Sequence, residues 1–361
     1  MSVEPPSHRK GRGAPANPEG RFESRQTQAM DDGWGSLEEP LPPLQTRVHV
    51  DQARSIISRN ESPDIAFDQS INPYRGCEHG CVYCYARPSH GYLNLSAGLD
   101  FETQLFYKPQ AARLLEAELS RPGYRCALIA LGANTDPYQP VERQLGVTRQ
   151  LLEVLWRFRH PVSITTKGAA LIERDLPLLA EMARENLVSV AISITTLDPA
   201  LKRSLEPRAA SPQARLRILE ALSRAGVPTL IFFSPVIPFV NDAEMERVLA
   251  AGAEAGARGA SYIPLRLPHE VKDLFRAWLQ VHAPLKAEHV MSLVQQMRGG
   301  RDNDPRFGSR MRGEGEYAGI LQQRFRLACR RLGLKAGERI ELATDRFRVP
   351  PRPGDQMGLD F

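Results

Sequence analysis

Three of the chain's five cysteines lie within eight residues, in the stretch CEHGCVYCYARPSH from Cys77 to His90. Cysteine thiolates bind zinc and iron–sulfur clusters. A structural zinc site takes four ligands, usually from two separated pairs, and no second C-x2-C or histidine pair follows, although His79 and His90 could supply one ligand. Three thiolates on a [4Fe-4S] cluster leave one iron open to a small molecule. The C-x3-C-x2-C spacing of Cys77, Cys81 and Cys84 therefore favours a cluster over zinc.

Composition limits the class of protein. A chain of 361 residues with 42% hydrophobic content can bury the core of one large α/β barrel or of two ordinary domains. An odd number of clustered cysteines argues against a disulfide framework. The first residues form no apolar signal segment and no apolar run reaches eighteen residues, so we expect a cytoplasmic protein without a membrane partner. The formal charge of +5 and the pI near 9.0 would suit a polyanionic partner.

Apolar, β-branched runs alternate with helical patterns along most of the chain. Short continuous runs of this kind are typical of parallel strands covered on both faces. They are SINPYRG (70–76), CALIALGA (126–133), PVSITTK (161–167), LVSVAISIT (187–195), PTLIFFSPVI (228–237) and GASYIPLRL (259–267). Helical patterns follow over 142–158, 170–185, 211–226 and 243–256, with Ser211 as an expected N-cap and Gly226 and Gly256 as expected C-terminal caps. Six serial βα units predict an α/β barrel or doubly wound sheet with its chemistry at the carboxyl ends of the strands.

The two ends of the chain differ from this middle part. Residues 1–45 are rich in Pro, Gly and charge, and we predict a disordered tail. The core domain is expected over 60–298 and a basic C-terminal extension over 299–361. From residue 298 to residue 339 there are eleven Lys or Arg against five Asp or Glu, including an expected amphipathic helix over 319–332. This excess fits either a solvated helical face or an anion-binding face.

The cysteine motif, C-x3-C-x-aromatic-C after a first strand, resembles that of the radical S-adenosylmethionine superfamily. The stretches NPYRGCEHGCVYCYAR, GANTDPYQPVE, SITTKGAALIERD and SPVIPFVND are similar to the spore-photoproduct-lyase-like branch, and within it to a bacterial group of uncharacterised members. The leading KGRGAPANPEGRFE and the trailing RFGSRMRGEGEYA are also similar to that group. The resemblance implies an incomplete (βα)6 barrel of the TIM type. It also implies one [4Fe-4S] cluster on the three cysteines, with S-adenosylmethionine chelated at the fourth iron.

The resemblance also implies roles for residues at the strand ends. One electron cleaves S-adenosylmethionine, and the resulting 5'-deoxyadenosyl radical takes a hydrogen atom from the substrate. The protein binds and orients the cofactor and the substrate and excludes competing reactions. The turn of Asn134 and Asp136 would contact the amino group, Lys167 the carboxylate and Ser193 the ribose. Tyr83 and the backbone near Ser234 would contact the adenine. Tyr83 and Tyr85 match positions that take part in hydrogen transfer in the lyase.

One departure from the lyase concerns hydrogen return. The lyase uses a cysteine just before the polar turn after the second strand, and Ala133 stands there in this chain. DNA photoproduct repair is therefore not the expected reaction. Cys126 is expected to be a core thiol on the opposite face of that strand, and Cys329 a structural residue on the basic helix.

Two further polar residues lie on loops expected at the same end of the strands. Arg208 is expected to meet the substrate or the methionine carboxylate, or else to form a surface ion pair with Glu206. His269 is expected to face the mouth of the barrel.

Three functions compete. The leading one is a radical S-adenosylmethionine enzyme with an unidentified substrate, for which nucleic acid is a candidate, and with a reductase or flavodoxin-type electron donor. The second is a nucleic-acid-binding protein whose cluster or zinc is structural, with the basic segment making the contact. The third, with little support, is a redox sensor.

Overall fold

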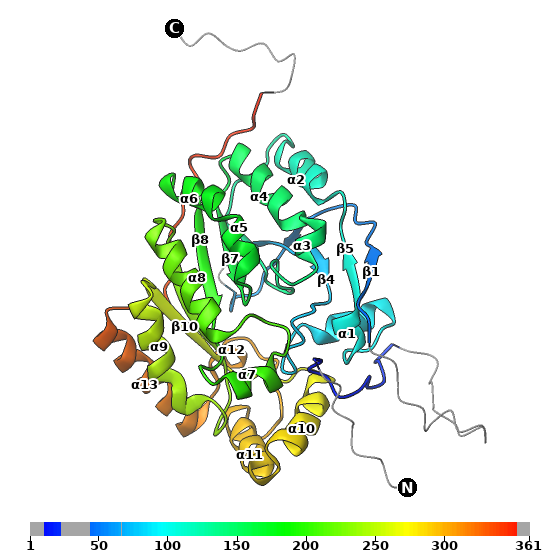
Figure 1. The fold of residues 1–361 in the computed structure, drawn as a ribbon, viewed down its shortest axis with the longest axis vertical. Coiled ribbons are helices and arrows are strands. Elements are labelled where there is room, and N and C mark those ends of the chain that lie inside the picture. Colours follow the sequence, from blue (N-terminus) through cyan, green and yellow to red (C-terminus); the bar gives the residue numbers. More distant parts are fainter. Residues whose placement is uncertain (1–10, 23–43, 66, 352–361) are drawn as a thin grey trace, which may run out of the picture.

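The computed structural model describes residues 11–22, 44–65 and 67–351. An eight-stranded sheet, with the order β11-β10-β9-β8-β7-β6-β3-β2, forms its centre (Figure 1). Its strands are β2 (Ile57–Arg59), β3 (Gln69–Ile71), β6 (Ile129–Leu131), β7 (Val162–Thr166), β8 (Val188–Ser193), β9 (Thr229–Val236), β10 (Gly259–Pro264) and β11 (Lys335–Ala336). All neighbours are parallel except β2 and β3.

The strand order confirms the predicted α/β fold. From β3 through β6 to β10, six parallel strands lie side by side in the order in which they occur in the chain. Among the described residues β3 and β10 do not pair, so the sheet has an open side, as an incomplete (βα)6 barrel does. A separate three-stranded sheet joins β1 (Arg47–Val50), β5 (Gln104–Tyr107) and β4 (Tyr74–Arg75) in the order β1-β5-β4.

Helices surround the sheet. Helices α4, α6, α8 and α9 lie along its outer face, while α10 and α11 lie at the lower end of the molecule in Figure 1. The α-helices are α1 (Asp100–Thr103), α2 (Ala111–Leu119), α3 (Glu142–Leu145), α4 (Val147–Arg157), α5 (Ala170–Arg174), α6 (Leu176–Arg184), α7 (Pro199–Leu205), α8 (Pro212–Arg224), α9 (Met245–Glu254), α10 (Val271–His282), α11 (Ala287–Met297), α12 (Ser309–Arg312) and α13 (Gly315–Leu332). Short 3-10 helices are η1 (Arg87–Leu93), η2 (Asp242–Glu244) and η3 (Pro284–Lys286).

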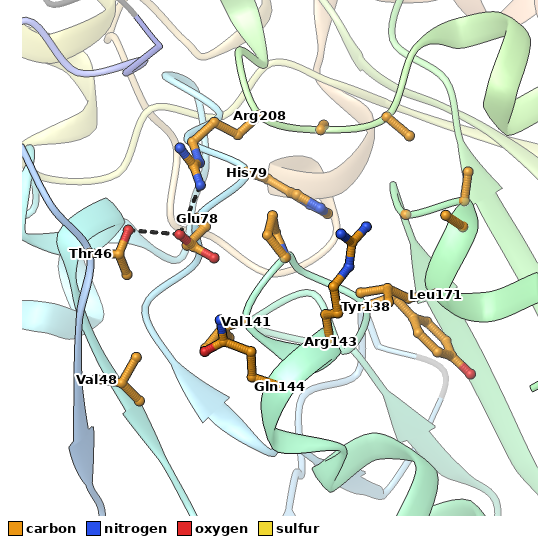
Figure 2. Close-up of a pocket in the computed structure, with 16 residues that line it drawn as sticks. Thr46, Val48, Glu78, His79, Tyr138, Val141, Arg143, Gln144, Leu171 and Arg208 are labelled. Atoms are coloured by element: carbon orange, nitrogen blue, oxygen red, sulfur yellow. Dashed lines mark hydrogen bonds and ion pairs between the residues drawn. The ribbon is translucent and has the colours of Figure 1, made fainter. Parts of the chain in front are cut away.

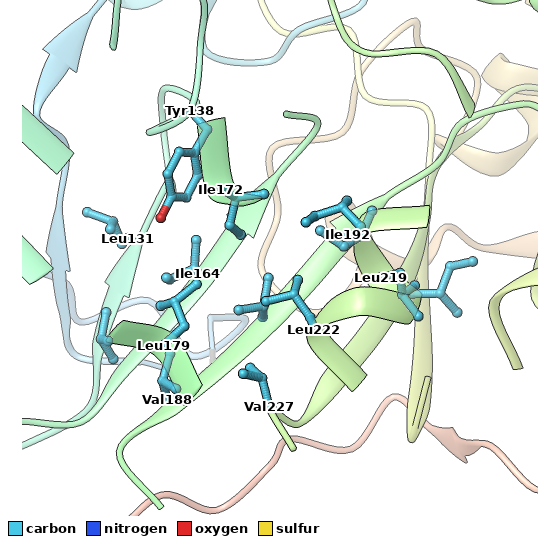
Figure 3. Packing of buried hydrophobic residues seen from close by; sticks show 14 of the residues in the cluster. Leu131, Tyr138, Ile164, Ile172, Leu179, Val188, Ile192, Leu219, Leu222 and Val227 are labelled. Carbon is cyan, nitrogen blue, oxygen red and sulfur yellow. The ribbon is translucent and has the colours of Figure 1, made fainter. Parts of the chain in front are cut away.

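The central strands are buried on both faces. All six residues of β8 are buried, and its sequence VSVAIS is dominated by β-branched residues that suit such a strand. Figure 3 shows Ile164, Val188 and Ile192 of the strands packed against Leu179 and Leu222 of α6 and α8. This core fixes the relative positions of the strand ends, where the polar residues lie.

Local details differ from the sequence predictions in two places. The strand predicted over 126–133 is shorter, and Cys126 precedes it and is only partly buried, so the prediction of a core thiol there is wrong. The helix predicted over 142–158 is interrupted by Gly146, which has a φ of 62°. Ser211 does cap its helix, because its hydroxyl accepts from the backbone of Ala214 at 3.2 Å.

The described segments 11–22 and 299–351 pack against the rest of the protein more closely than composition indicates. Residues 11–22 pack against the core, so the prediction of a disordered tail over 1–45 does not describe them; 1–10 and 23–43 lie outside the described residues. In the predicted extension, β11 pairs with β10 and α13 packs against α9 and α11. Cys329 of α13 is 1% exposed, in agreement with a structural role. No helix in the described ranges is long and apolar enough to cross a membrane.

Two helical glycines give a matched test of this packing. A Cβ on Gly252 of α9 would lie 2.3 Å from Cδ1 of Ile231 in β9, whereas a Cβ on Gly319 of α13 would meet nothing within 4 Å. We expect Gly252→Ala to lower the free energy of unfolding by roughly 1–3 kcal/mol, because overpacking outweighs the helix preference of alanine. We expect Gly319→Ala to raise it by about 0.5–1 kcal/mol. Urea unfolding of both variants checks this, and a stabilised Gly252→Ala would contradict it.

Candidate functional site

The cysteine loop follows β4 and takes its shape from two glycines. Gly76 and Gly80 have φ values of 78° and 67°, in the region that favours glycine. A Cβ on Gly76 would lie 2.9 Å from the backbone oxygen of Phe101, and one on Gly80 would lie 2.7 Å from Oε2 of Glu102. The backbone on both sides of Cys77 can therefore approach α1 only because these residues have no side chain.

The three thiols of the loop are close together and shielded from water. Cys77 and Cys81 are each 8% exposed, Cys84 is half-buried, and all three are free of disulfides. Burial, and then the charges of Asp136 and of the other two thiols, raise the pKa of Cys77 well above its ordinary value. Burial also raises the pKa of Cys81 to about 12 and raises that of Cys84. Iron binding to these sulfurs would therefore have to displace protons.

Backbone N–H groups face two of the sulfurs. The backbone N–H of His79 acts to lower the pKa of Cys77, and the backbone N–H groups of Ala86 and Arg87 act to lower that of Cys84. Hydrogen bonds to the sulfurs are a known means of tuning an iron–sulfur cluster. The loop thus has the ligand type and the backbone donors that such a cluster requires.

The loop is not arranged as a site for a single ion. In the part of the chain that the structure describes, no group of three or more His, Cys, Asp or Glu side chains could hold a metal ion. The thiolates of a four-iron cluster bind three different irons and stand further apart than ligands of one ion.

A buried ion pair fastens the loop to the rest of the protein. Arg87 and Glu102 are both 0% exposed, and Nη2 of Arg87 lies 2.5 Å from Oε1 of Glu102. Arg87 also donates to the backbone oxygens of Cys81, Ala97 and Gly98 at 2.8, 3.1 and 2.8 Å. The fold thus satisfies this buried cation almost completely.

The N-terminal segment 11–22 covers the loop from outside. The backbone N–H groups of Gly13 and Ala14 donate to the Glu102 carboxylate at 3.0 and 2.8 Å. A Cβ on Gly13 would lie only 1.7 Å from the backbone oxygen of Gly80, between Cys77 and Cys81. The segment continues to Arg21, which pairs with Glu270 at 2.7 Å. It therefore crosses from α1 to the loop that follows β10.

Three of the predicted cofactor residues come together at the ends of β7, β8 and β9. Lys167 Nζ donates to Ser193 Oγ at 2.6 Å, and Ser193 Oγ donates to the backbone oxygen of Ser234 at 3.4 Å. The Ser234 hydroxyl is buried and has no hydrogen-bond partner among the described residues. An unpaired buried hydroxyl beside a lysine leaves hydrogen-bonding capacity for a ligand.

Tyr83 joins this group through Glu206, which is fully buried. The Tyr83 hydroxyl and Thr195 Oγ1 both donate to Glu206, which also pairs with Arg215 and lies 3.9 Å from Lys167 Nζ. Burial raises the pKa of Glu206, but Arg215, Lys167 and the two hydroxyl donors outweigh it and lower the pKa to about 2. The carboxylate is thus ionised at neutral pH; Tyr83 and Lys167 lie at its Oε1 and Arg215 at its Oε2.

Sequence reasoning missed the contribution of Glu206 and Arg215. Arg215 does carry a signal, because it occupies the apolar face of its helix, in register with Ile218, Leu219 and Leu222. A charged residue on such a face is buried only with a partner. Nothing in the sequence identifies Glu206 as that partner.

The turn after β6 is held together by Asp136. Its carboxylate accepts from Thr166 Oγ1 at 2.6 Å, from the N–H of Lys167 at 2.7 Å and from that of Tyr138 at 2.9 Å, and lies 3.3 Å from His79 Nδ1. Burial opposes ionisation, but His79 and these hydrogen bonds lower the pKa of Asp136 to about 2. These contacts occupy the carboxylate. The side-chain amide of Asn134, in the same turn, has no hydrogen bond within the described ranges, while its backbone N–H donates to Asn72 at 2.9 Å.

Tyr85 lies apart from Tyr83, at the surface of the site. It is 49% exposed, and its hydroxyl donates to the backbone oxygen of Ala133, the residue that stands where the lyase has its cysteine. The guanidinium of Arg266 lies 5.7 Å from the centre of its ring. The two tyrosines thus have different surroundings, one buried on a carboxylate and one open to solvent.

One loop residue, Arg208, has another partner than expected. Arg208 pairs with Glu78 at 3.0 Å, and Glu206 pairs with Arg215, so the expected pair of Arg208 with Glu206 is wrong. His269 is exposed and has a φ of 48°.

A cavity of about 540 Å³ lies on another side of the cysteine loop. Figure 2 shows Glu78 and His79 of the loop facing it, with Arg143 and Arg208 at its wall. Lys167, Ser193 and Ser234 are not among its lining residues. The cavity is therefore lined by other residues than the polar group at the strand ends, which contains the predicted cofactor residues.

Several known proteins are similar to this chain in sequence. The chain is 40% identical over 225 residues to uncharacterised proteins of Mycobacterium tuberculosis and Mycobacterium bovis, which covers 61% of this chain and 66% of theirs, just under two thirds of their length. It is 28% identical over 174 residues to an uncharacterised protein of Methanocaldococcus jannaschii, covering 48% of this chain and 62% of that one.

Solved structures support the fold. A structure of spore photoproduct lyase complexed with dinucleoside spore photoproduct superposes with a TM-score of 0.58, covering 80% of this chain and 81% of that one, at 14% sequence identity. This likeness concerns the fold alone. The sequence profile of the radical SAM superfamily matches residues 71–251, which is half of the chain and includes the cysteine loop and the ends of β7, β8 and β9. The chain therefore belongs to the radical SAM superfamily.

Proposed function

We propose that this chain is a radical S-adenosylmethionine enzyme in which Cys77, Cys81 and Cys84 hold one [4Fe-4S] cluster. Such a cluster, reduced by one electron, cleaves S-adenosylmethionine to methionine and a 5'-deoxyadenosyl radical that takes a hydrogen atom from the substrate. One observation carries the proposal. Two buried thiols and one half-buried thiol lie beside a polar group that has a cation, Lys167, and an unpaired buried hydroxyl, Ser234.

Lys167 is suited to bind the carboxylate of S-adenosylmethionine. An ammonium has three N–H donors, and Lys167 uses one on Ser193, so donors remain for a ligand. Its backbone N–H is fixed by Asp136 and its Nζ lies 3.9 Å from Glu206. These contacts orient the side chain before the ligand binds, which reduces the cost of binding.

The remaining contacts are those that the resemblance to the spore-photoproduct-lyase-like branch implies. Ser193 would bind the ribose, Asn134 the amino group, and Tyr83 with the Ser234 region the adenine. Asp136 would act through the turn that it holds, because its carboxylate already accepts several hydrogen bonds. The half-exposed Tyr85 is suited to meet the substrate.

The substrate and the electron donor are further parts of the proposal. The net charge of +5 is compatible with nucleic acid, and a reductase or a flavodoxin-type protein would supply the electron. Ala133 provides no thiol for hydrogen return, so repair of a DNA photoproduct is not the proposed reaction.

The cluster ligands give the first test. After anaerobic reconstitution with iron and sulfide, we expect Cys77→Ala to lose most bound iron and the paramagnetic signal of the reduced protein. It should also release no 5'-deoxyadenosine. Cys126→Ala, whose thiol lies outside the loop, should behave as the parent. If Cys77→Ala kept the iron content and signal of the parent, the ligand assignment would fail.

Lys167 gives the second test. Loss of a hydrogen bond from a charged donor costs about 1.5–3 kcal/mol, so Lys167→Met should bind S-adenosylmethionine roughly ten- to hundredfold more weakly. The measurement is the titrated change of the cluster's paramagnetic signal on adding S-adenosylmethionine. Iron content should stay unchanged, and the exposed Lys286→Met serves as control. If both variants bound S-adenosylmethionine with equal affinity, the assignment of Lys167 to its binding site would be wrong.

The covering segment gives a third test. Gly13→Val would place methyl groups against the backbone of Gly80, whereas the side chain of Ala16 is exposed. We expect Gly13→Val to speed the loss of iron in air several-fold, because it separates residues 11–22 from the cysteine loop, and Ala16→Val to have no effect. Iron release followed with a chelator measures both rates. Equal rates would show that the segment does not protect the cluster site.

A further inference from the structure

Arg266 lies on the open side of the sheet, close to the cysteine loop. It follows β10 by two residues, and its guanidinium lies 5.7 Å from the ring centre of Tyr85. Tyr85 in turn donates to the backbone oxygen of Ala133, just beyond β6. Because β10 does not pair with β3 among the described residues, Tyr85 and Arg266 together span the unpaired side of the six-stranded arrangement.

The guanidinium of Arg266 is poorly satisfied. Arginine has five N–H donors. The one hydrogen bond of the Arg266 side chain to a described residue runs from Nη1 to the sulfur of Met311 at 3.2 Å, and thioether sulfur is a weak acceptor. Its Nε is buried without a partner, and no carboxylate in the described ranges forms an ion pair with it. Leaving such a charged group unpaired costs stability.

Two neighbouring arginines have more hydrogen-bond or ion-pair partners than Arg266. Nη1 and Nη2 of Arg298 donate to the backbone oxygens of four residues at distances from 2.7 to 3.3 Å, although its Nε too lacks a partner. Arg310 pairs with Asp64 at 2.6 Å, and Asp64 also accepts from the N–H of Gly308 at 2.6 Å. The nearby carboxylate thus binds Arg310 and Gly308, and among the described residues it forms no ion pair with Arg266.

The local charge around Arg266 favours an anion. Burial, and then the positive charge of Arg310, lower the pKa of Arg266, while Tyr85 and Asp64 act in the opposite direction. Residues 298–312 contain five arginines and two aspartates. An added anion would restore hydrogen bonds to Arg266 and reduce the repulsion between it and Arg310.

We propose that Arg266 binds an oxyanion, either a phosphate or a carboxylate, that the substrate carries. A guanidinium binds both groups through two parallel hydrogen bonds. The half-exposed ring of Tyr85 forms the adjoining wall, so the anion holds the substrate against the residue that faces the reaction site. The assignment of this anion to the substrate rests on the proposed function, whereas anion binding itself needs neither cluster nor cofactor.

The test uses thermal unfolding of the full-length protein in sodium chloride, phosphate or acetate at equal ionic strength. Phosphate stabilises many proteins without binding, so the informative quantity is the difference between variants. We expect oxyanions to raise the Tm of the parent and of Arg301→Met by more than they raise that of Arg266→Met. Arg301 is an exposed arginine of the same segment and serves as the matched control. The anion affinity of Arg266→Met should fall roughly tenfold or more.

A second readout is the direction in which Arg266→Met changes the Tm in chloride. In chloride, Arg266→Met should melt above the parent, because the substitution removes an unpaired and partly buried cation; a purely structural arginine would make it melt lower. A response to phosphate alone identifies a phosphate-bearing substrate, and a response to acetate alone a carboxylate-bearing one. Equal anion responses in the parent and Arg266→Met, or a lowered Tm of Arg266→Met in chloride, overturn the proposal. Cleavage of S-adenosylmethionine is measured separately, so either proposal can fail while the other stands.

Discussion

The buried ion pair of Arg87 and Glu102 is the interaction on which the cysteine loop depends. Both side chains are 0% exposed, and removing one partner of such a pair typically costs about 3–5 kcal/mol, because the other charge stays buried. Arg87 holds the loop through the backbone of Cys81, and Glu102 holds residues 13 and 14 of the N-terminal segment. One carboxylate therefore joins three parts of the chain that are far apart in sequence, and the cysteines lie where these parts meet.

A second buried carboxylate organises the other side of the site. Glu206 forms an ion pair with Arg215, accepts hydrogen bonds from Tyr83 and Thr195, and lies near Lys167. Its low pKa means that it stays charged at neutral pH and balances the two cations. Lys167 Nζ lies 3.9 Å from this negative charge, which partly offsets the cost of burying the lysine. The site thus depends on charge balance set before any ligand arrives.

Much of this could be predicted from the sequence, because the relevant signals are local. Continuous β-branched runs identify the buried strands, and polar residues at their carboxyl ends, such as Lys167 and Ser193, must gather at one edge of a parallel sheet. The cysteine spacing identifies the loop. The pairs that hold these pieces in place could not be predicted, because Glu206 with Arg215 and Glu102 with Gly13 are tertiary contacts without a periodic pattern. Composition predicts disorder near Gly13, because it carries no information about a contact with a residue as distant in sequence as Glu102.

The contact between Gly13 and Glu102 also bears on the order in which the protein is assembled. The two residues are 89 positions apart, and synthesis proceeds from the N-terminus. Gly13 therefore leaves the ribosome long before the carboxylate that receives it, and also before the three cysteines. The segment can close over the loop only after Glu102 has been made. Until then the three thiols lack this cover, and the segment encloses them only once Gly13 and Ala14 have bonded to Glu102.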